Sequence, residues 1–440
     1  MVDRSPGPGP GLIPNPFIKK RNLKWSLEIP SPLSGAEKNH GDEDEDEDEP
    51  NTSDRTPPGH SAALESGSAS IPDPAAHFFT HLARHTLSPY PSDAARLPAD
   101  EFRSLFERSV GSADGAHFVV HQHDHPIAGT HYDLRLQINP TSSVSWAVMY
   151  GLPGDANSAR LNRNATETRV HWLWNHVVET ASRVTGSLVV WDTGRYEVLR
   201  RKGKNGPSVD PDSEEEDEGD DGGTEQERLA RAFGERKIRV RLCGSKLPRG
   251  YVLNLRLTKG EDLEGRRKSE RTLGRPARKR RRGVGGKKEV LVETSEEEDD
   301  DDEGEDVVPD QSSGASEGEK GLTDVDRELR ELEDEVVRQT NAYKGAENSV
   351  GSVHQRRWYL SLDREASGFV RKIVDGKKVW VLKDDGAEDG DESGRLRFPF
   401  YIGGPDVERS VVTGRLGEEV LRDEGVTGFV KRKGWKPVLN

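Results

Sequence analysis

The sequence has little cysteine and no long apolar run, and each shortage excludes a class of protein. Its single cysteine, Cys243, excludes an intramolecular disulfide. No stretch of about 18 apolar residues could form a membrane-spanning helix. The first residues also lack the apolar segment of a secretory signal peptide. We therefore expect a protein of a reducing compartment, the cytosol or the nucleus.

Apolar residues are also scarce. They make up 31% of the 440 residues, whereas charged residues make up 33%. Much of the chain therefore cannot bury enough apolar surface to offset the entropy lost on ordering. The composition predicts one compact core interrupted by long disordered segments, rather than the two or three domains that the length alone suggests.

The net charge of −15 is concentrated in a few segments. Twenty-nine acids lie in the runs 42–49, 210–225 and 293–306, so the remainder of the chain carries +14. A basic segment, 266–288, has 12 basic residues and one acid, and it contains the block Arg278-Lys-Arg-Arg-Arg282. Such a block is typical of nuclear import or of nucleic-acid contact. We therefore predict a nuclear protein, with the cytoplasm as a further location.

These shifts in composition divide the chain into five predicted segments. Residues 1–72 form a mostly disordered arm with a possible docking island at 15–28, and residues 73–114 form short helices. Residues 115–258 form the core, with an acidic insert at 203–228. Residues 259–350 are a disordered basic and acidic insert with a helix near 322–339. Residues 351–440 supply a final strand and a C-terminal extension.

Alternating apolar and polar residues dominate the core. The alternation predicts eight strands, at 117–123, 131–138, 144–150, 169–174, 186–191, 237–242, 251–257 and 358–362. Short, regularly spaced strands with Gly and Pro turns are typical of a mainly β protein. We expect a small antiparallel β-barrel with short helices beside it.

Histidines gather where this barrel begins. Five of the 13 lie between His117 and His131. Successive side chains of a strand face opposite ways, so His131, Asp133 and Arg135 share one face while the apolar residues between them share the other. His123 on the preceding strand would lie beside them if the chain turns back between the two strands. Imidazoles with a carboxylate suit a divalent ion such as Mn, Fe, Zn or Co, and the arginine suits a phosphate oxygen.

The order of motifs resembles that of the 3′-phosphoesterase domain of bacterial DNA ligase D, mainly over residues 115–257. The motifs are Phe118-Val-Val-x-x-His-Asp124, His131-Tyr-Asp-Leu-Arg-Leu136, Ser145-Trp-Ala-Val148, Asn175-His176, Val189-Val-Trp-Asp-x-Gly194 and Leu242-x-Gly-x-Lys-Leu247. The resemblance implies a compact β-barrel that trims 3′-phosphates and ribonucleotides from DNA ends with Mn²⁺. A stand-alone chain with acidic inserts looks like a fungal-type member.

The resemblance also assigns roles to residues. It makes His123, His131 and Asp133 the metal ligands, and it places Arg135 and His176 on the phosphate. Arg21 and Glu28 resemble the N-terminal arm that closes over the site in that family. The implied reaction is metal-assisted hydrolysis, in which a bound water attacks while Arg135 and His176 offset the charge on the phosphate.

Several positions depart from the family pattern. The turn before His131 is two residues longer and lacks paired arginines, Tyr150 replaces a lysine, and Thr180 replaces a tyrosine. The ligand set is kept, but the lost lysine argues against ribonucleotide removal. No ligase or polymerase lysine motif is visible, so the resemblance implies DNA 3′ ends as substrate, with a separate ligase or polymerase as partner.

Two other functions remain open. A non-catalytic nuclear scaffold could use the barrel to bind DNA ends and its charged arms to bind chromatin. Alternatively, His131, Asp133 and the distant His176 satisfy the two-histidine, one-carboxylate pattern of Fe(II) oxygenases. That second assignment leaves His123 and Arg135 without a role.

Overall fold

The computed structural model describes residues 60–65, 69–200, 223–273, 335–374, 376–383 and 394–439. The chain divides into a unit of residues 1–55 and a unit of residues 56–440, and every described residue belongs to the second. The docking island at 15–28 therefore lies outside the described residues, as do Arg21 and Glu28.

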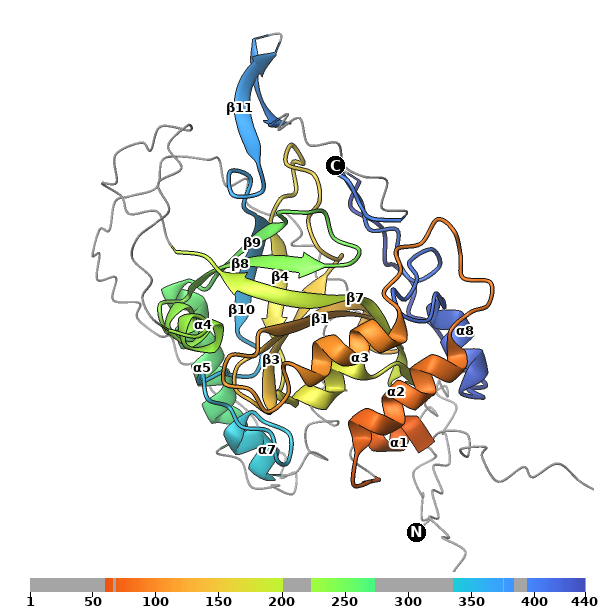
Figure 1. The fold of residues 1–440 in the computed structure, drawn as a ribbon. Helices are drawn as coiled ribbons and strands as arrows, with labels where there is room; N and C mark the ends of the chain where they lie inside the picture. Colours follow the sequence, from red (N-terminus) through yellow and green to blue (C-terminus); the bar gives the residue numbers. More distant parts are fainter. Residues whose placement is uncertain are drawn as a thin grey trace, which may run out of the picture. The chain divides into compact units, whose positions relative to one another are not determined.

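A closed antiparallel barrel of eight strands forms the centre of the second unit (Figure 1). Its strands are paired in the order β1-β2-β3-β4-β10-β9-β8-β7, and β7 pairs with β1 to close the ring. Their bounds are β1 His117–His125, β2 Gly129–Gln137, β3 Ser142–Met149, β4 Arg163–Glu167, β7 Gly186–Val198, β8 Lys237–Gly244, β9 Val252–Arg256 and β10 Arg357–Leu362. The expectation of a mainly β protein with an antiparallel barrel and short helices is confirmed.

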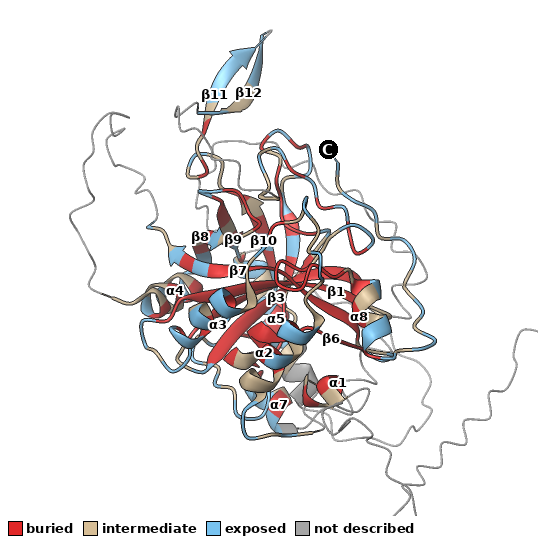
Figure 2. Cartoon of the chain, turned by 45° about the vertical axis from the view of Figure 1, so that its right-hand side comes forward, coloured by how far each residue is buried: buried red, intermediate tan, exposed pale blue. Residues whose placement is uncertain are grey.

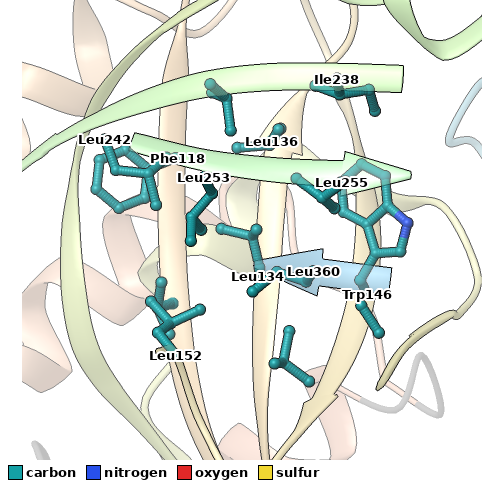
Figure 3. Close-up of a cluster of buried hydrophobic side chains, with 14 of the residues drawn as sticks. Phe118, Leu134, Leu136, Trp146, Leu152, Ile238, Leu242, Leu253, Leu255 and Leu360 are labelled. Atoms are coloured by element: carbon teal, nitrogen blue, oxygen red, sulfur yellow. The ribbon is translucent and has the colours of Figure 1, made fainter. Parts of the chain in front are cut away.

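Alternation along each strand fills the barrel with apolar side chains. Figure 3 shows Phe118, Leu134, Leu136 and Trp146 meeting residues of the later strands, such as Leu253. All five are buried, and burying a side chain of this size stabilises the fold by about 1.5–3 kcal/mol relative to exposure. The interior of the barrel is therefore a packed core.

Short helices lie outside the barrel. They are α1 His60–Glu65, α2 Pro74–His85, α3 Ala99–Glu107, η1 Leu173–Val177, α4 Glu225–Gly234, α5 Lys259–Leu273, α7 Glu335–Thr340 and α8 Gly417–Asp423. Asp73 caps α2 by accepting from the backbone of Ala76, and Thr224 opens α4 with a capping box. No helix among the described residues is long and apolar enough to span a membrane.

A second apolar cluster covers the outer wall of β1 and β7. Phe78 and Phe79 of α2 and Phe102 of α3 pack there against Val177 and Val190. The ring of Phe78 stacks on Trp174 of η1, with 5.9 Å between ring centroids. This packing holds η1, which carries His176, against the wall of the barrel.

Several elements differ from the sequence-based prediction. The strand expected at 169–174 is instead β5 (His171–Trp172) followed by η1, and the barrel strand is β4, at 163–167. A short strand β6 (Thr180–Ser182) extends the sheet beside β7. The described ends of the predicted insert 259–350 are structured, because α5 and α7 lie there and Arg356 binds Asp262 of α5 at 2.7 Å.

A two-stranded hairpin follows the barrel. Its strands are β11 Phe369–Val374 and β12 Lys377–Leu382, and they form a sheet of their own. The hairpin projects away from the barrel in both views (Figures 1 and 2). Neither strand is among those predicted from the sequence.

Candidate metal centre and phosphate pocket

The candidate site lies on the outer face of β1 and β2. The pairing places His123 opposite His131 and His121 opposite Asp133. Tyr132 and Leu134 point into the barrel, so His131, Asp133 and Arg135 point outward. The strand alternation that builds the core therefore also builds the site.

Three of the predicted residues converge as a possible metal centre. His123, His131 and Asp133 each offer one ligand atom, and these atoms all lie within 4.8 Å of one another. Nδ1 of His123 lies 3.6 Å from Oδ2 of Asp133, and Nε2 of His131 lies 3.4 Å from Oδ1. Two imidazoles and a carboxylate form a donor set that suits a divalent transition metal.

Backbone carbonyls orient both imidazoles toward Asp133. Nε2 of His123 donates to the carbonyl of Thr185 at 2.8 Å, and Nδ1 of His131 donates to that of Gly129 at 2.9 Å. In the neutral rings the remaining nitrogens, Nδ1 of His123 and Nε2 of His131, therefore carry lone pairs. Outer hydrogen bonds of this kind fix the tautomer of metal-binding histidines. The ligand atoms fit a divalent ion in this respect too.

The charges of His123, His131 and Asp133 shift one another's pKa values. Burial alone would raise the pKa of Asp133, but His131, His123 and Arg135 hold it well below its usual value. Burial likewise lowers the pKa of His131. For His123 burial alone would lower the pKa, but the carboxylate of Asp133, the carbonyl of Thr185 and the charge of Glu65 together outweigh it, and the pKa is raised. Asp133 is thus a carboxylate at neutral pH, as a metal ligand must be.

Arg135 extends the site on the side of Asp133. Its Nη2 lies 3.4 Å from Oδ2 of Asp133, and its side chain is only 4% exposed. Its Nε and Nη1 are buried and have no hydrogen-bond partner among the described residues, and neither does the hydroxyl of Ser145 on the next strand. Unpaired buried donors are costly unless a ligand completes them. These donors suit an anion with several oxygens, such as a phosphate.

His176 is held by a buried histidine pair. Its Nδ1 lies 2.8 Å from Nδ1 of His117, and its Nε2 is buried with no hydrogen-bond partner in the part of the chain that the structure describes. Burial lowers the pKa of both rings, that of His117 to about 3. If His117 donates within the pair, Nε2 of His176 carries the proton and can donate to a phosphate oxygen. His117 thus positions and orients His176.

Three further residues lie near the triad. Nε2 of His121 donates to the carbonyl of Val178 at 3.1 Å, and its Nδ1 is buried without a hydrogen-bond partner among the described residues. His171 is buried and interacts electrostatically with Arg135. Glu65 of α1 also interacts with the triad, where burial raises its pKa and His123 lowers it. Glu65 is far from the core motifs in sequence, and no local pattern indicates its place.

Three positions around the site do not contribute to the triad. His125 caps the β1–β2 turn, because its Nδ1 accepts from the backbone of Ile127 and Ala128. Tyr150, at the lysine position of the family, is 46% exposed at the end of β3. Thr180, at the tyrosine position, is buried, and its hydroxyl has no partner.

The C-terminal extension completes the walls of the site. Arg432 donates from Nη1 to the carbonyl of Ile127 at 2.8 Å and covers Gly129, so a guanidinium reaches the turn that lacks paired arginines. Arg415 is fully buried and donates to Glu179 at 2.9 Å, just after η1. A buried pair of this kind is costly to break, so the extension fixes the segment that carries His176.

Comparison with known proteins agrees with this geometry. No curated protein matches the chain. The family model described as the DNA Ligase D 3′-phosphoesterase domain matches residues 121–255, which include His123, His131, Asp133, Arg135 and His176. The resemblance predicted from the sequence is thereby confirmed: over about a third of its length the chain is similar to the DNA ligase D 3′-phosphoesterase family.

Proposed function

We propose that the barrel is a manganese-dependent phosphoesterase that acts on 3′-phosphate ends of DNA during repair. The observation that carries the proposal is the position of Arg135. Its two unpaired nitrogens lie beside a group of His123, His131 and Asp133 that could hold a metal ion. The family match to a 3′-phosphoesterase domain supports the same reaction.

Each residue has a distinct part in this reaction. His123, His131 and Asp133 would hold the ion, which when bound polarises a phosphoryl oxygen and lowers the pKa of a bound water. Arg135 binds the phosphate oxygens and offsets charge that builds on them. His176 donates from Nε2 to the phosphate, in the tautomer that its bond to His117 allows.

We propose a 3′-phosphate as the preferred substrate over a 3′-ribonucleotide. Ribonucleotide removal in the family is associated with a lysine where this chain has Tyr150. A phenol carries no positive charge near neutral pH and cannot replace an ammonium group at a phosphate. The proposed setting is the nucleus, beside a separate ligase or polymerase that uses the cleaned 3′ end.

The test is release of phosphate from duplex DNA with a recessed 3′-phosphate, with and without Mn²⁺. We expect release that needs the metal and that is lost in the His131→Ala, Asp133→Ala double variant. A second substrate ending in one 3′-ribonucleotide should be processed slowly or not at all. The same assay on Tyr150→Lys shows whether that position sets the difference between the substrates.

Failure of this test would favour another function. Binding of metal and DNA ends without turnover would support the non-catalytic nuclear scaffold. An Fe(II) oxygenase would instead need His176 as its third ligand. Two observations argue against the oxygenase. The group that could hold a metal ion among the described residues contains His123, and His176 is hydrogen-bonded to His117.

A further inference from the structure

The hairpin of β11 and β12 has no part in the site described above. It follows β10 in the chain, and the antiparallel register places the end of β10 at the same end of the barrel as the β1–β2 turn and the β3–β4 loop. His123 and His131 lie toward that end of their strands. The hairpin therefore leaves the barrel from the end at which the metal centre lies.

Its charge is strongly positive. Residues 369–383 contain five basic residues and one acid. Arg371, Lys372, Lys377 and Lys378 are exposed. The register places Arg371 and Lys378 on one face of the ribbon and Lys372 and Lys377 on the other. Cations on both faces can meet both walls of a groove lined by phosphates.

The base of the hairpin is fixed to the barrel. Phe369 is buried and belongs to the barrel core. The backbone of Trp380 exchanges two hydrogen bonds of 2.8 Å with the side chain of Asn157, in the β3–β4 loop. The guanidinium groups of Arg364 and Arg371 lie over the ring of Trp380, at 5.0 and 4.8 Å from its centroid. An isolated two-stranded hairpin is marginally stable, and these contacts hold it in place.

Apolar side chains in the outer part of the hairpin are exposed. Ile373 is 74% exposed and Val374 is 47% exposed, and Figure 2 shows the hairpin as mostly exposed beyond its base. Apolar side chains at the tip of a basic ribbon would be buried if the ribbon entered a groove. An antiparallel ribbon of two strands fits the major groove of duplex DNA.

We infer that the β11–β12 hairpin is an arm that grips duplex DNA, through its backbone phosphates, beside the 3′ end held at the metal centre. The inference rests on the proposed function for its choice of DNA end. The duplex grip itself depends only on the hairpin. Because the contacts are to phosphates, the arm adds affinity without sequence preference.

The test is duplex binding by a variant with Arg371, Lys372, Lys377 and Lys378 all changed to Gln. Fluorescence anisotropy with a blunt duplex should show affinity at about 0.1 M salt lower by at least tenfold. The slope of log affinity against log salt should become shallower by about 3 to 4, since each lost phosphate contact removes about 0.9.

Two matched variants isolate the arm. Changing Arg108, Arg195, Arg256 and Arg357 to Gln removes the same charge from other exposed positions, and this variant should keep most of the affinity. Exchanging Lys for Arg and Arg for Lys at the four hairpin positions keeps the charge and should bind like the parent. An equal loss in the first variant, or a loss in the second, would overturn the inference.

Failure of the arm and failure of the proposed function give different results. Metal binding and phosphate release from a 3′-phosphorylated trinucleotide should be unchanged in the hairpin variant, because that substrate is too short to reach the arm. Absence of that release in the parent would count against the enzyme alone. Unchanged duplex affinity and salt slope with a lowered melting temperature would instead overturn the arm, and would indicate that the four side chains serve the stability of the fold.

Discussion

The two faces of β2 are equally buried but opposite in chemistry. Inside the barrel, Leu134 and Leu136 have no polar atoms, and the hydroxyl of Tyr132 donates to Gln122 at 2.9 Å. On the outer face, Asp133 and Arg135 are 5% and 3% exposed, yet each keeps buried polar atoms that have no hydrogen-bond partner among the described residues. One strand thus has a satisfied face and an unsatisfied face.

The inner face of β2 therefore serves mainly stability, and the outer face serves mainly function. Buried apolar side chains stabilise the fold by leaving water, whereas unpaired buried donors and acceptors destabilise it until a ligand completes them. Substitutions on the inner face should therefore affect folding first. Those on the outer face should affect metal and phosphate first.

The largest expected contrast comes from neighbouring residues of β2. Leu134→Ala leaves a cavity in the core and should lower the free energy of unfolding by about 2–5 kcal/mol, with little change in metal affinity of the folded protein. His131→Gln removes a ligand nitrogen and should lower Mn²⁺ affinity at least about a hundredfold, with a smaller loss of stability. Calorimetric titration and urea unfolding of both variants measure the contrast. Full metal affinity in His131→Gln would remove His131 from the ligand set.

Lowering the pH should destabilise the fold, because several buried histidines near the site are held neutral. His117, with a pKa of about 3, and His121, His171 and His176, with lowered pKa values, are neutral in the fold but take up protons near pH 6.5 when unfolded. Their contribution to stability is full above pH 6.5 and falls as the pH drops below it, by up to about 1.4 kcal/mol per pH unit for His117 alone. His123 has a raised pKa and acts in the opposite direction.

Urea unfolding of the metal-free protein between pH 7 and pH 5 measures this slope. In His117→Gln the slope should be shallower by up to about 1.4 kcal/mol per pH unit, a limit approached near pH 5, because one of the buried histidines is gone. A slope identical to that of the parent would mean that His117 is charged in the fold.

A smaller effect should come from Arg135→Lys. The exchange keeps the charge but removes the planar guanidinium, so a bidentate phosphate contact is lost. We expect phosphate release to fall at least about tenfold, roughly 1.4 kcal/mol, while metal affinity and melting temperature stay near those of the parent. An unchanged rate with a lowered melting temperature would mean that Arg135 serves the fold through its contact with Asp133.

The sequence predicts the outer face of β2 well because its alternation is strict. Apolar residues at 132, 134 and 136 leave His131, Asp133 and Arg135 no other face to occupy. The partner strand β1 follows from the same alternation. The sequence signal for the candidate ligands His123, His131 and Asp133 is therefore local, because two adjacent strands and one turn carry it.

Strand β4 was missed for a physical reason. Its inward positions include Arg163 and Glu167, and charged residues at such positions hide the apolar alternation. Glu167 is tolerated there because Arg356, from a distant part of the chain, pairs with it at 2.5 Å. No local pattern carries that information, and the same holds for Glu65 and for the pair of Arg415 with Glu179.

The hairpin, by contrast, has a local turn signal in the sequence. Asp375-Gly376 between two β-prone segments is a strong indication of a two-residue hairpin turn. Because basic residues lie on both faces of the hairpin, its two strands do not show the alternation of apolar and polar residues that is typical of a packed strand. A ribbon that packs only at its base does not show the pattern of a buried sheet.

The position of β10 in the ring has a consequence for synthesis of the protein. β10 closes the barrel between β4 and β9, and Arg415 fixes the segment after His176, yet both follow the family-matched residues 121–255. A nascent chain emerges from the ribosome N-terminus first, so the candidate metal ligands appear long before the barrel can close. Until β10 has left the exit tunnel, the growing chain presents an open sheet with unpaired edges on β4 and β9. The emergence of β10 and Arg415, rather than synthesis of the candidate ligands, is then the step that assembles the site.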